Sequence, residues 1–166
     1  MRRSTLAATR LAVALSVTAL AACSKKDTAS PIGPAEPVPE TYVAQMTAGK
    51  ELPNPLTTGA VGTATFVFTP TNGITYKIDV TGLSASPSAM HIHAPGDATQ
   101  LAPVIVGFNG YAVSTSGPIA SGTILGVSAT VSLDSLKALI RGGKVYAQVH
   151  TTAFGGGEIR AQLVKQ

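Results

Sequence analysis

The chain has 166 residues, of which 12 are basic and 8 acidic, and its formal net charge is +4. Three of the basic residues are arginines among the first ten, so a mature chain without residues 1–22 keeps nine basic and eight acidic residues, a formal net charge of +1. Nucleic-acid binding needs a basic patch, and this composition therefore excludes nucleic acid as an expected partner. The single cysteine, Cys23, excludes an internal disulfide, so stability is expected to come from core burial.

The N-terminal segment has the layout of an export signal. Its arginines precede an apolar run at residues 11–22, about a dozen residues, which is well short of the roughly 20 needed to span a bilayer as a helix. The run ends in Leu-Ala-Ala-Cys at 20–23, which resembles a bacterial lipobox. The resemblance implies that residues 1–22 are removed, that Cys23 is acylated, and that the lipid bilayer is a partner. An ordinary signal peptide with an incidental cysteine is the alternative.

The residues after Cys23 predict a tether. Residues 23–40 contain four prolines and almost no large apolar side chains, so they are expected to form an extended spacer rather than a packed structure. In the lipoprotein sorting pattern of Gram-negative bacteria, Ser24 after the acylated cysteine implies the outer membrane. The predicted localisation is therefore the cell envelope, on either side of the outer membrane.

Residues 41–166 are expected to form one domain, a size at which a single core suffices. Eight segments are rich in Val, Ile and Thr or alternate in polarity, which predicts short strands. In chain order they are 41–47, 62–69, 74–81, 89–94, 103–108, 121–127, 144–151 and 158–164. A loop rich in Pro, Gly and Thr is expected at 48–61.

Two local signals refine this prediction. Asn72-Gly73 lies between two alternating runs, which is a strong indication of a β-hairpin. Ser132 and Gly142 enclose leucines at helical spacing, which predicts one short helix that closes one end of the domain. The expected fold is all-β, an antiparallel Greek-key sandwich or barrel with one short helix.

The three histidines lie in two of the predicted strands. Side chains alternate along a strand, so His91 and His93 are expected on one face, with Met90, Ile92 and Ala94 in the core. In the strand at 144–151 the same alternation places His150 on the non-core face together with Tyr146 and Gln148. If the strands are neighbours, three neutral imidazoles are a suitable ligand set for copper, zinc or nickel.

A second interpretation gives these histidines a structural role, in which each ring bonds a loop carbonyl or a carboxylate such as Asp97 or Glu158. Glu158, Arg160 and Gln162 are expected on the outer face of the last strand, and Glu158 and Arg160 are expected to form a surface or buried ion pair. The sequence contains no Gly-x-Ser-x-Gly elbow and no phosphate-binding glycine loop, so no catalytic residue is nominated and enzymatic activity is not the favoured reading.

Three blocks of the domain are TYVAQMTAGKELPNPLTTGAVGTATFVF, MHIHAPGD and LDSLKALIRGGKVYAQVHTTAFGGGEIRAQL. These blocks resemble the CHRD domain, first described in chordin and widespread in bacterial exported proteins, and the resemblance spans nearly all of residues 41–164. The resemblance implies an all-β, Greek-key-like domain whose molecular function is largely unassigned. The positions that it marks are His91, His93, His150, Gly157, Glu158, Ile159 and Arg160.

A more distant likeness concerns His91-Ile92-His93, followed by Gly96 and Asp97, which is similar to the copper-ligand strand of copper/zinc superoxide dismutases. The chain lacks the disulfide cysteines and the zinc-binding loop of those enzymes, so dismutase activity is not expected. A single copper site on a related scaffold is the part of the likeness that stays open.

These observations lead to three hypotheses. The first is a lipid-anchored binding or interaction module of the cell envelope, whose ligand is a protein, a glycan or a metal. The second is a copper- or zinc-binding protein that uses His91, His93 and His150. The third is a purely structural envelope protein. No cofactor follows with certainty from the sequence, and copper and zinc are the candidates.

Overall fold

The structure is a computed structural model that describes residues 38–127 and 130–166. The predicted signal peptide, Cys23 and nearly all of the predicted tether lie outside the described residues. The strands are β1 (Thr41–Thr47), β2 (Val61–Phe68), β3 (Ile74–Thr81), β4 (Pro87–His93), β5 (Val104–Gly107), β6 (Gly117–Ile124), β7 (Tyr146–Thr151), β8 (Ile159–Gln162) and β9 (Val164–Lys165). A 3-10 turn, η1 (Ala48–Lys50), follows β1, and one α-helix, α1 (Leu133–Arg141), precedes β7.

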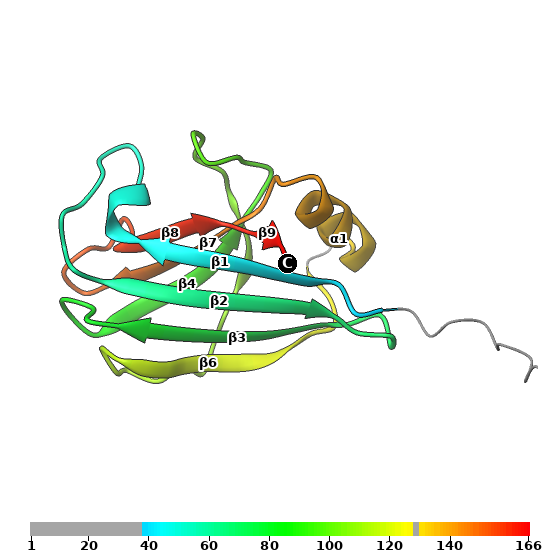
Figure 1. Cartoon of the computed structure of the whole chain (residues 1–166), viewed down its shortest axis with the longest axis horizontal. Coiled ribbons are helices and arrows are strands. Elements are labelled where there is room, and N and C mark those ends of the chain that lie inside the picture. Colours follow the sequence, from blue (N-terminus) through cyan, green and yellow to red (C-terminus); the bar gives the residue numbers. More distant parts are fainter. Residues whose placement is uncertain (1–37, 128–129) are drawn as a thin grey trace, which may run out of the picture. The chain divides into compact units, whose positions relative to one another are not determined.

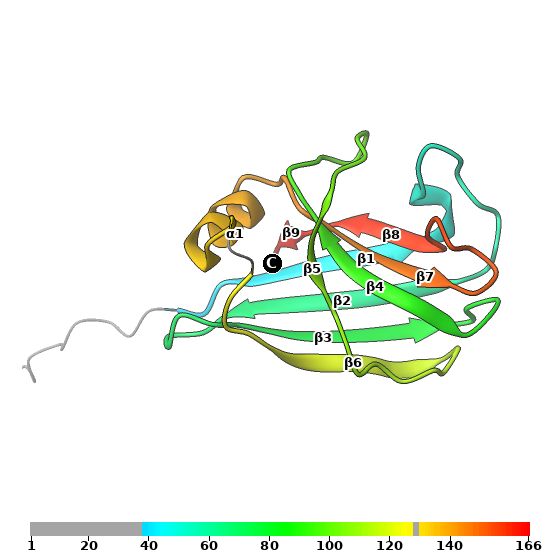
Figure 2. The ribbon, with the colours of Figure 1, turned by 180° about the vertical axis from the view of Figure 1, so that it is seen from behind.

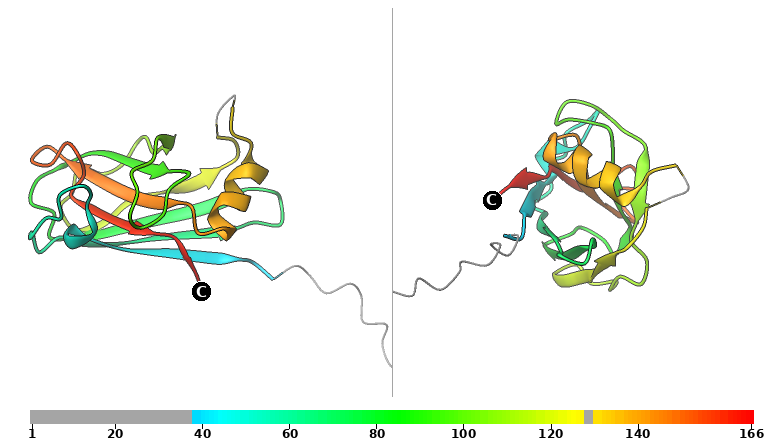
Figure 3. Two further views of the ribbon diagram at one scale, coloured as in Figure 1. Left: turned by 90° about the horizontal axis from the view of Figure 1, so that it is seen from above. Right: turned by 90° about the vertical axis from the view of Figure 1, so that its right-hand side faces the viewer.

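The strands form one antiparallel sheet in the order β5-β4-β7-β8-β1-β2-β3-β6, with β9 also paired to β1. The sheet curls into a half-barrel around a common interior (Figures 1 and 3). The expected hairpin joins β2 and β3, which pair in register over their full length. In its turn Asn72 adopts a φ of +62°. The prediction of an all-β antiparallel fold with one short helix is confirmed, with a curled sheet in place of two stacked ones.

The interior is filled by the side chains that alternation directs inward. From β4, Met90 and Ile92 are fully buried, and from β7 and β8, Val149 and Ile159 are fully buried. Phe66 of β2 packs against Tyr76 and Phe108 in an aromatic cluster. These residues belong to a single hydrophobic cluster that spans the described strands.

Helix α1 lies across one end of the half-barrel, near the start of β1 (Figures 1 and 2). It begins after Ser132, whose hydroxyl accepts a hydrogen bond from the backbone N–H of Ser135, and it ends at Gly142. Its inner residues Leu136 and Ile140 are buried. The predicted bounds and the predicted role of closing one end are therefore confirmed. Within the described residues, no helix is both long and apolar enough to cross a membrane.

The predicted strand at 121–127 is displaced. In the structure β6 covers Gly117–Ile124, because its ladder with β3 begins at Gly117 and is interrupted by a bulge beside Ile78 and Asp79. The seven other predicted strands are present with shifts of up to two residues at their ends; the last is divided into β8 and β9.

The outer face of the β4–β7–β8 region is buried as well as the inner face. All six residues of β7 are buried, Glu158 is fully buried, and Arg160 is 1% exposed. Residues of the loops that follow β1, β4 and β7 form hydrogen bonds with the side chains on this side of the sheet. Alternation selects the correct face for these side chains, but the face is covered by loops rather than by water.

Candidate metal centre

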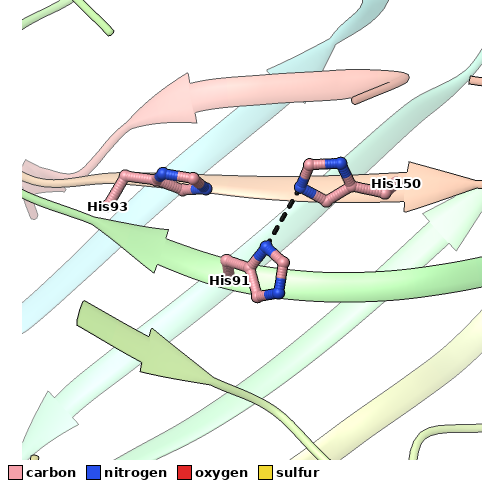
Figure 4. Close-up of side chains that lie close together, drawn as sticks. All are labelled: His91, His93 and His150. Carbon is pink, nitrogen blue, oxygen red and sulfur yellow. Dashed lines mark hydrogen bonds between the residues drawn. The ribbon is translucent and has the colours of Figure 1, made fainter. Parts of the chain in front are cut away.

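The three histidines occupy adjacent strands. His91 and His93 project from β4, and His150 projects from β7, which pairs with β4 along its length. In this register His93 lies opposite Tyr146 and Ala89 lies opposite His150, so all three imidazoles are on the same side of the sheet. Figure 4 shows the three rings gathered above the two strands. The structure thus brings together the residues that the sequence nominated.

The rings are close enough to share one ion. One ring nitrogen from each histidine lies within 4.8 Å of the other two. His91 Nδ1 is 3.1 Å from His150 Nε2, in a hydrogen bond between the two rings (Figure 4). The centroid of the His91 ring lies 5.6 Å from that of His93 and 4.8 Å from that of His150.

The outer hydrogen bonds of two of these rings fix their tautomers. His93 Nδ1 lies 2.8 Å from the carbonyl oxygen of Ala102, and His150 Nδ1 lies 3.0 Å from that of Gly155. Since a carbonyl only accepts, both Nδ1 atoms carry the proton and both Nε2 atoms present a lone pair. Metal-bound histidines commonly donate their second ring N–H to a carbonyl in this way. The same two contacts also fit the structural interpretation, in which each ring bonds a loop carbonyl. The structural and the metal-binding interpretations are therefore compatible.

Two of the lone pairs face the space between the rings. His150 Nε2 accepts the hydrogen bond from His91 Nδ1. His93 Nε2 is buried and has no hydrogen-bond partner among the described residues. A buried acceptor without a partner costs free energy, so this nitrogen is a natural position for a ligand or an ion.

The environment keeps the imidazoles uncharged at neutral pH. Burial lowers the pKa of His93 to about 4. Burial also lowers the pKa of His91, with a smaller contribution from His150, and it lowers the pKa of His150 despite the hydrogen bond to Gly155. A metal ion binds the neutral form of imidazole, so the site needs no deprotonation at pH 7.

A stack of planar groups supports His93. Its ring lies parallel to that of Tyr146, with centroids 4.7 Å apart, and the guanidinium carbon of Arg160 lies 3.6 Å from the centroid of the same tyrosine ring. The Tyr146 hydroxyl accepts a hydrogen bond from the backbone N–H of Ala102, the residue whose carbonyl holds His93. These contacts restrict the His93 ring in orientation before any ligand is present.

Gln148 and Glu51 form a second polar pair beside the cluster. Gln148 lies opposite His91 in the register, and its amide donates to a Glu51 carboxylate oxygen at 2.6 Å and to the carbonyl of Gly156 at 3.0 Å. Burial raises the pKa of Glu51 to about 7, against the opposing effects of the Gln148 hydrogen bond and the Arg160 charge. Sequence reasoning did not nominate Glu51, because it lies in an irregular loop where no periodicity indicates which way a side chain points.

The prediction of an ion pair between Glu158 and Arg160 was wrong. Among the described residues no salt bridge joins them, because each is held by a different loop. A Glu158 oxygen accepts hydrogen bonds from the backbone N–H and the hydroxyl of Ser84, whereas Arg160 donates to the carbonyls of Asp97 and Gln100. Both residues therefore fasten loops to the sheet, which matches a structural role.

Three imidazole nitrogens form an incomplete coordination shell. A zinc or copper ion lies about 2.0–2.1 Å from an imidazole nitrogen, so two ligand nitrogens on one tetrahedral ion are about 3.4 Å apart. The rings, whose nitrogens lie within 4.8 Å of one another, therefore have to approach by up to about 1.4 Å, and His91 has to move its proton from Nδ1 to Nε2. No carboxylate completes the cluster among the described residues, which leaves a fourth position for water or another ligand.

Comparison with protein families now places the chain. The model of the CHRD domain matches residues 42–163, which is most of its length. The chain belongs to the CHRD family. Membership in this family indicates a binding or interaction module, and the matched segment contains all three histidines together with Glu158 and Arg160. Comparison with curated proteins gives no match, and neither does comparison with solved structures.

Proposed function

We propose that this CHRD-domain protein is a binding module of the cell envelope, held to a membrane through acylated Cys23, and that its histidine site binds one copper or zinc ion. The observation that carries the metal assignment is the convergence of three imidazoles, one nitrogen from each within 4.8 Å. Two of these rings are held from behind by backbone carbonyls, and their Nε2 atoms are left as acceptors.

The ligand type favours a transition metal over calcium or magnesium. Imidazole is a good ligand for copper and zinc, whereas calcium and magnesium prefer oxygen ligands. Two buried carboxyl groups lie in this region and both are engaged: the pKa of Glu51 is raised to about 7 by burial and this group accepts from Gln148, while Glu158 accepts from Ser84. Three neutral nitrogens and one open position suit capture or transfer of an ion.

An equilibrium titration tests the assignment. The chain carrying Cys23→Ser, which removes the thiol as a competing ligand, is titrated with Cu(II) and with Zn(II) against a chelator of known affinity. We expect one equivalent of at least one of the two ions to bind with a dissociation constant below about 1 µM, equivalent to about 8 kcal/mol of binding free energy. His93→Gln and His150→Gln each weaken binding at least a hundredfold, whereas Asp79→Asn, which changes an exposed carboxylate, does not.

If that titration shows no binding, the metal assignment is rejected and the proposal of an anchored binding module remains. No affinity better than micromolar for either ion contradicts the metal assignment, and so does tight binding that both histidine variants retain.

The anchor has its own test. Cells that express the chain are labelled with a fatty-acid analogue and fractionated. Acylated protein in the membrane fraction, and loss of both label and membrane association in Cys23→Ser, are the expected results. Membrane association without label contradicts lipidation at Cys23, and label that survives the substitution places the lipid elsewhere.

A second candidate is recognition of a protein or glycan without any metal. Leu101, Val104 and Val113 are large apolar residues that stay exposed on and around β5, which is an edge strand of the sheet. Exposed apolar side chains at a sheet edge favour contact with another molecule. This candidate is preferred if the titration fails.

A further inference from the structure

A cavity lies on the outer side of the sheet, the side that carries the histidines. Arg160 borders this cavity and separates it from the histidines. It has a volume of about 580 Å³ and is bordered by β1 and β8, by the loop that starts at η1, and by Ala98. Pockets of about 300–1,000 Å³ are the usual size for small organic ligands. The histidine residues are not part of its lining, so it is distinct from the candidate metal centre.

Most of the lining is apolar. Val43 and Val164 border it from β1 and β9, Ala161 from β8, and Leu52 and Pro55 from the loop after η1. The polar members of the lining that are buried are Glu51 and Arg160, which are 2% and 1% exposed. An apolar hollow with a few convergent polar groups is the typical composition of a ligand site.

Arg160 lacks a counter-ion. Its Nη2 donates to the carbonyls of Asp97 and Gln100, and its Nη1 is buried with no hydrogen-bond partner among the described residues. No carboxylate forms a salt bridge with it in the part of the chain that the structure describes. A buried guanidinium without an anion is costly, and a bound anion removes that cost.

Glu51 limits the charge of such an anion. One of its oxygens accepts from Gln148, and the other, Oε1, is buried without a partner. Burial raises the pKa of this carboxyl to about 7, so at and below neutral pH much of it is protonated and can donate a hydrogen bond. Above that pH its charge opposes any anion beside Arg160, and it opposes a doubly charged anion more than a singly charged one. Lys50 at the exposed rim adds one further positive charge.

We propose that this cavity binds a small organic monocarboxylate with an apolar tail, with the carboxylate on Arg160 and the tail against Val43, Leu52 and Pro55. A neutral apolar molecule leaves Arg160 Nη1 unpaired. A phosphoryl group brings a second charge that Glu51 opposes. A monocarboxylate satisfies the guanidinium and fills the apolar part of the hollow.

The test uses decanoate as the probe, with decanol and decyl phosphate as matched ligands of different head group. The Cys23→Ser chain is titrated calorimetrically with each probe below its aggregation limit. We expect one decanoate per chain, bound at least tenfold more tightly than either of the other two. Equal binding of decanol shows an apolar hollow without anion recognition and overturns the proposal, as does preference for decyl phosphate or absence of saturable decanoate binding.

Two glycine substitutions locate the bound molecule without disturbing Arg160. Gly49 borders the cavity, and a side chain added there meets no atom within 4 Å, so Gly49→Leu adds bulk at the border of the cavity without a clash. Gly59, in the same connection between β1 and β2, has equal room but does not border the cavity. Gly49→Leu should weaken decanoate binding at least tenfold and Gly59→Leu should leave it unchanged. Unchanged affinity in Gly49→Leu means that decanoate binds elsewhere, which overturns the proposal whatever the outcome of the metal titration.

Discussion

The two faces of the β4–β7–β8 region are buried to a similar degree but have opposite chemistry. On the inner face Met90, Ile92 and Val149 are apolar and fully buried. On the outer face His150 and Gln148 are 9% and 4% exposed, and their polar groups bond loop carbonyls and a carboxyl group. The inner face gains its stability from packing. The outer face is ordered by hydrogen bonds to loops. On this side the buried His93 Nε2 and Arg160 Nη1 have no hydrogen-bond partner within residues 38–127 and 130–166.

Truncation on the inner face is expected to give the largest loss of stability. Ile92→Ala removes a fully buried side chain, and we expect the free energy of unfolding to fall by about 4 kcal/mol, since the neighbours cannot fully close the cavity. Urea denaturation measures it. Val61→Ala, at a position 45% exposed, is the control and should cost less than about 1 kcal/mol. A similar small cost for Ile92→Ala contradicts the packing assigned to the inner face.

On the outer face, Glu51 makes stability depend on pH. Its folded pKa of about 7 lies above the ordinary value of 4.5, so the folded state holds the proton more tightly than the unfolded state. The stability that this group contributes is complete below pH 4.5, is lost as pH rises toward 7, and is constant above that. The loss amounts to about 3 kcal/mol.

Glu51→Gln measures this effect, because the other titrating groups are common to both chains. The difference in unfolding free energy between the variant and the parent should shift in favour of the variant by about 3 kcal/mol between about pH 4 and about pH 8. A difference that stays constant with pH shows that Glu51 ionises normally in the folded chain.

The loop over the outer face requires a glycine at 157. Gly157 has a φ of +122°, and a Cβ there collides with the Gln148 amide and lies 2.8 Å from a Glu51 carboxyl oxygen. Gly157→Ala is expected to cost about 2 kcal/mol, from the backbone conformation and from displacement of Gln148. Gly155→Ala has open space and should be near neutral in thermal or urea unfolding. Equal effects at the two positions contradict the close packing of this loop.

An uncovered part of the outer surface should show the smallest effect. Lys77 and Asp79 on β3 form an ion pair at 2.8 Å with side chains 61% and 39% exposed. A double-mutant cycle with Lys77→Ala and Asp79→Ala should give a coupling free energy of about 0.5 kcal/mol that decreases with added salt. A coupling several times larger means that this surface is not solvated as the exposures indicate.

Local patterns predict much of this fold. Alternation places Ile92 inward and the histidines outward, Asn72-Gly73 marks the hairpin, and Ser132 and Gly142 mark the ends of the helix. These features depend on residues close together in the sequence, and the expected elements are present.

Features that depend on distant segments were not predictable in the same way. The covering of β7 depends on loops whose residues have no periodicity, and the partners of Glu158 and Arg160 are loop atoms more than 50 residues away. Tyr146 and Gln148 were assigned to the face of His150, but alternation carries no information on the stack against His93 or on the bond to Glu51. The sequence therefore predicted that the three histidines can lie together, and it did not predict the residues that surround them.

Electron paramagnetic resonance of the Cys23→Ser chain loaded with one equivalent of Cu(II) tests most directly whether the outer-face histidines act together. We predict one copper species whose nitrogen couplings come from three imidazoles and are reduced in His91→Gln, His93→Gln and His150→Gln. A spectrum of copper bound mainly by oxygen, or one that the three substitutions leave unchanged, contradicts the metal centre.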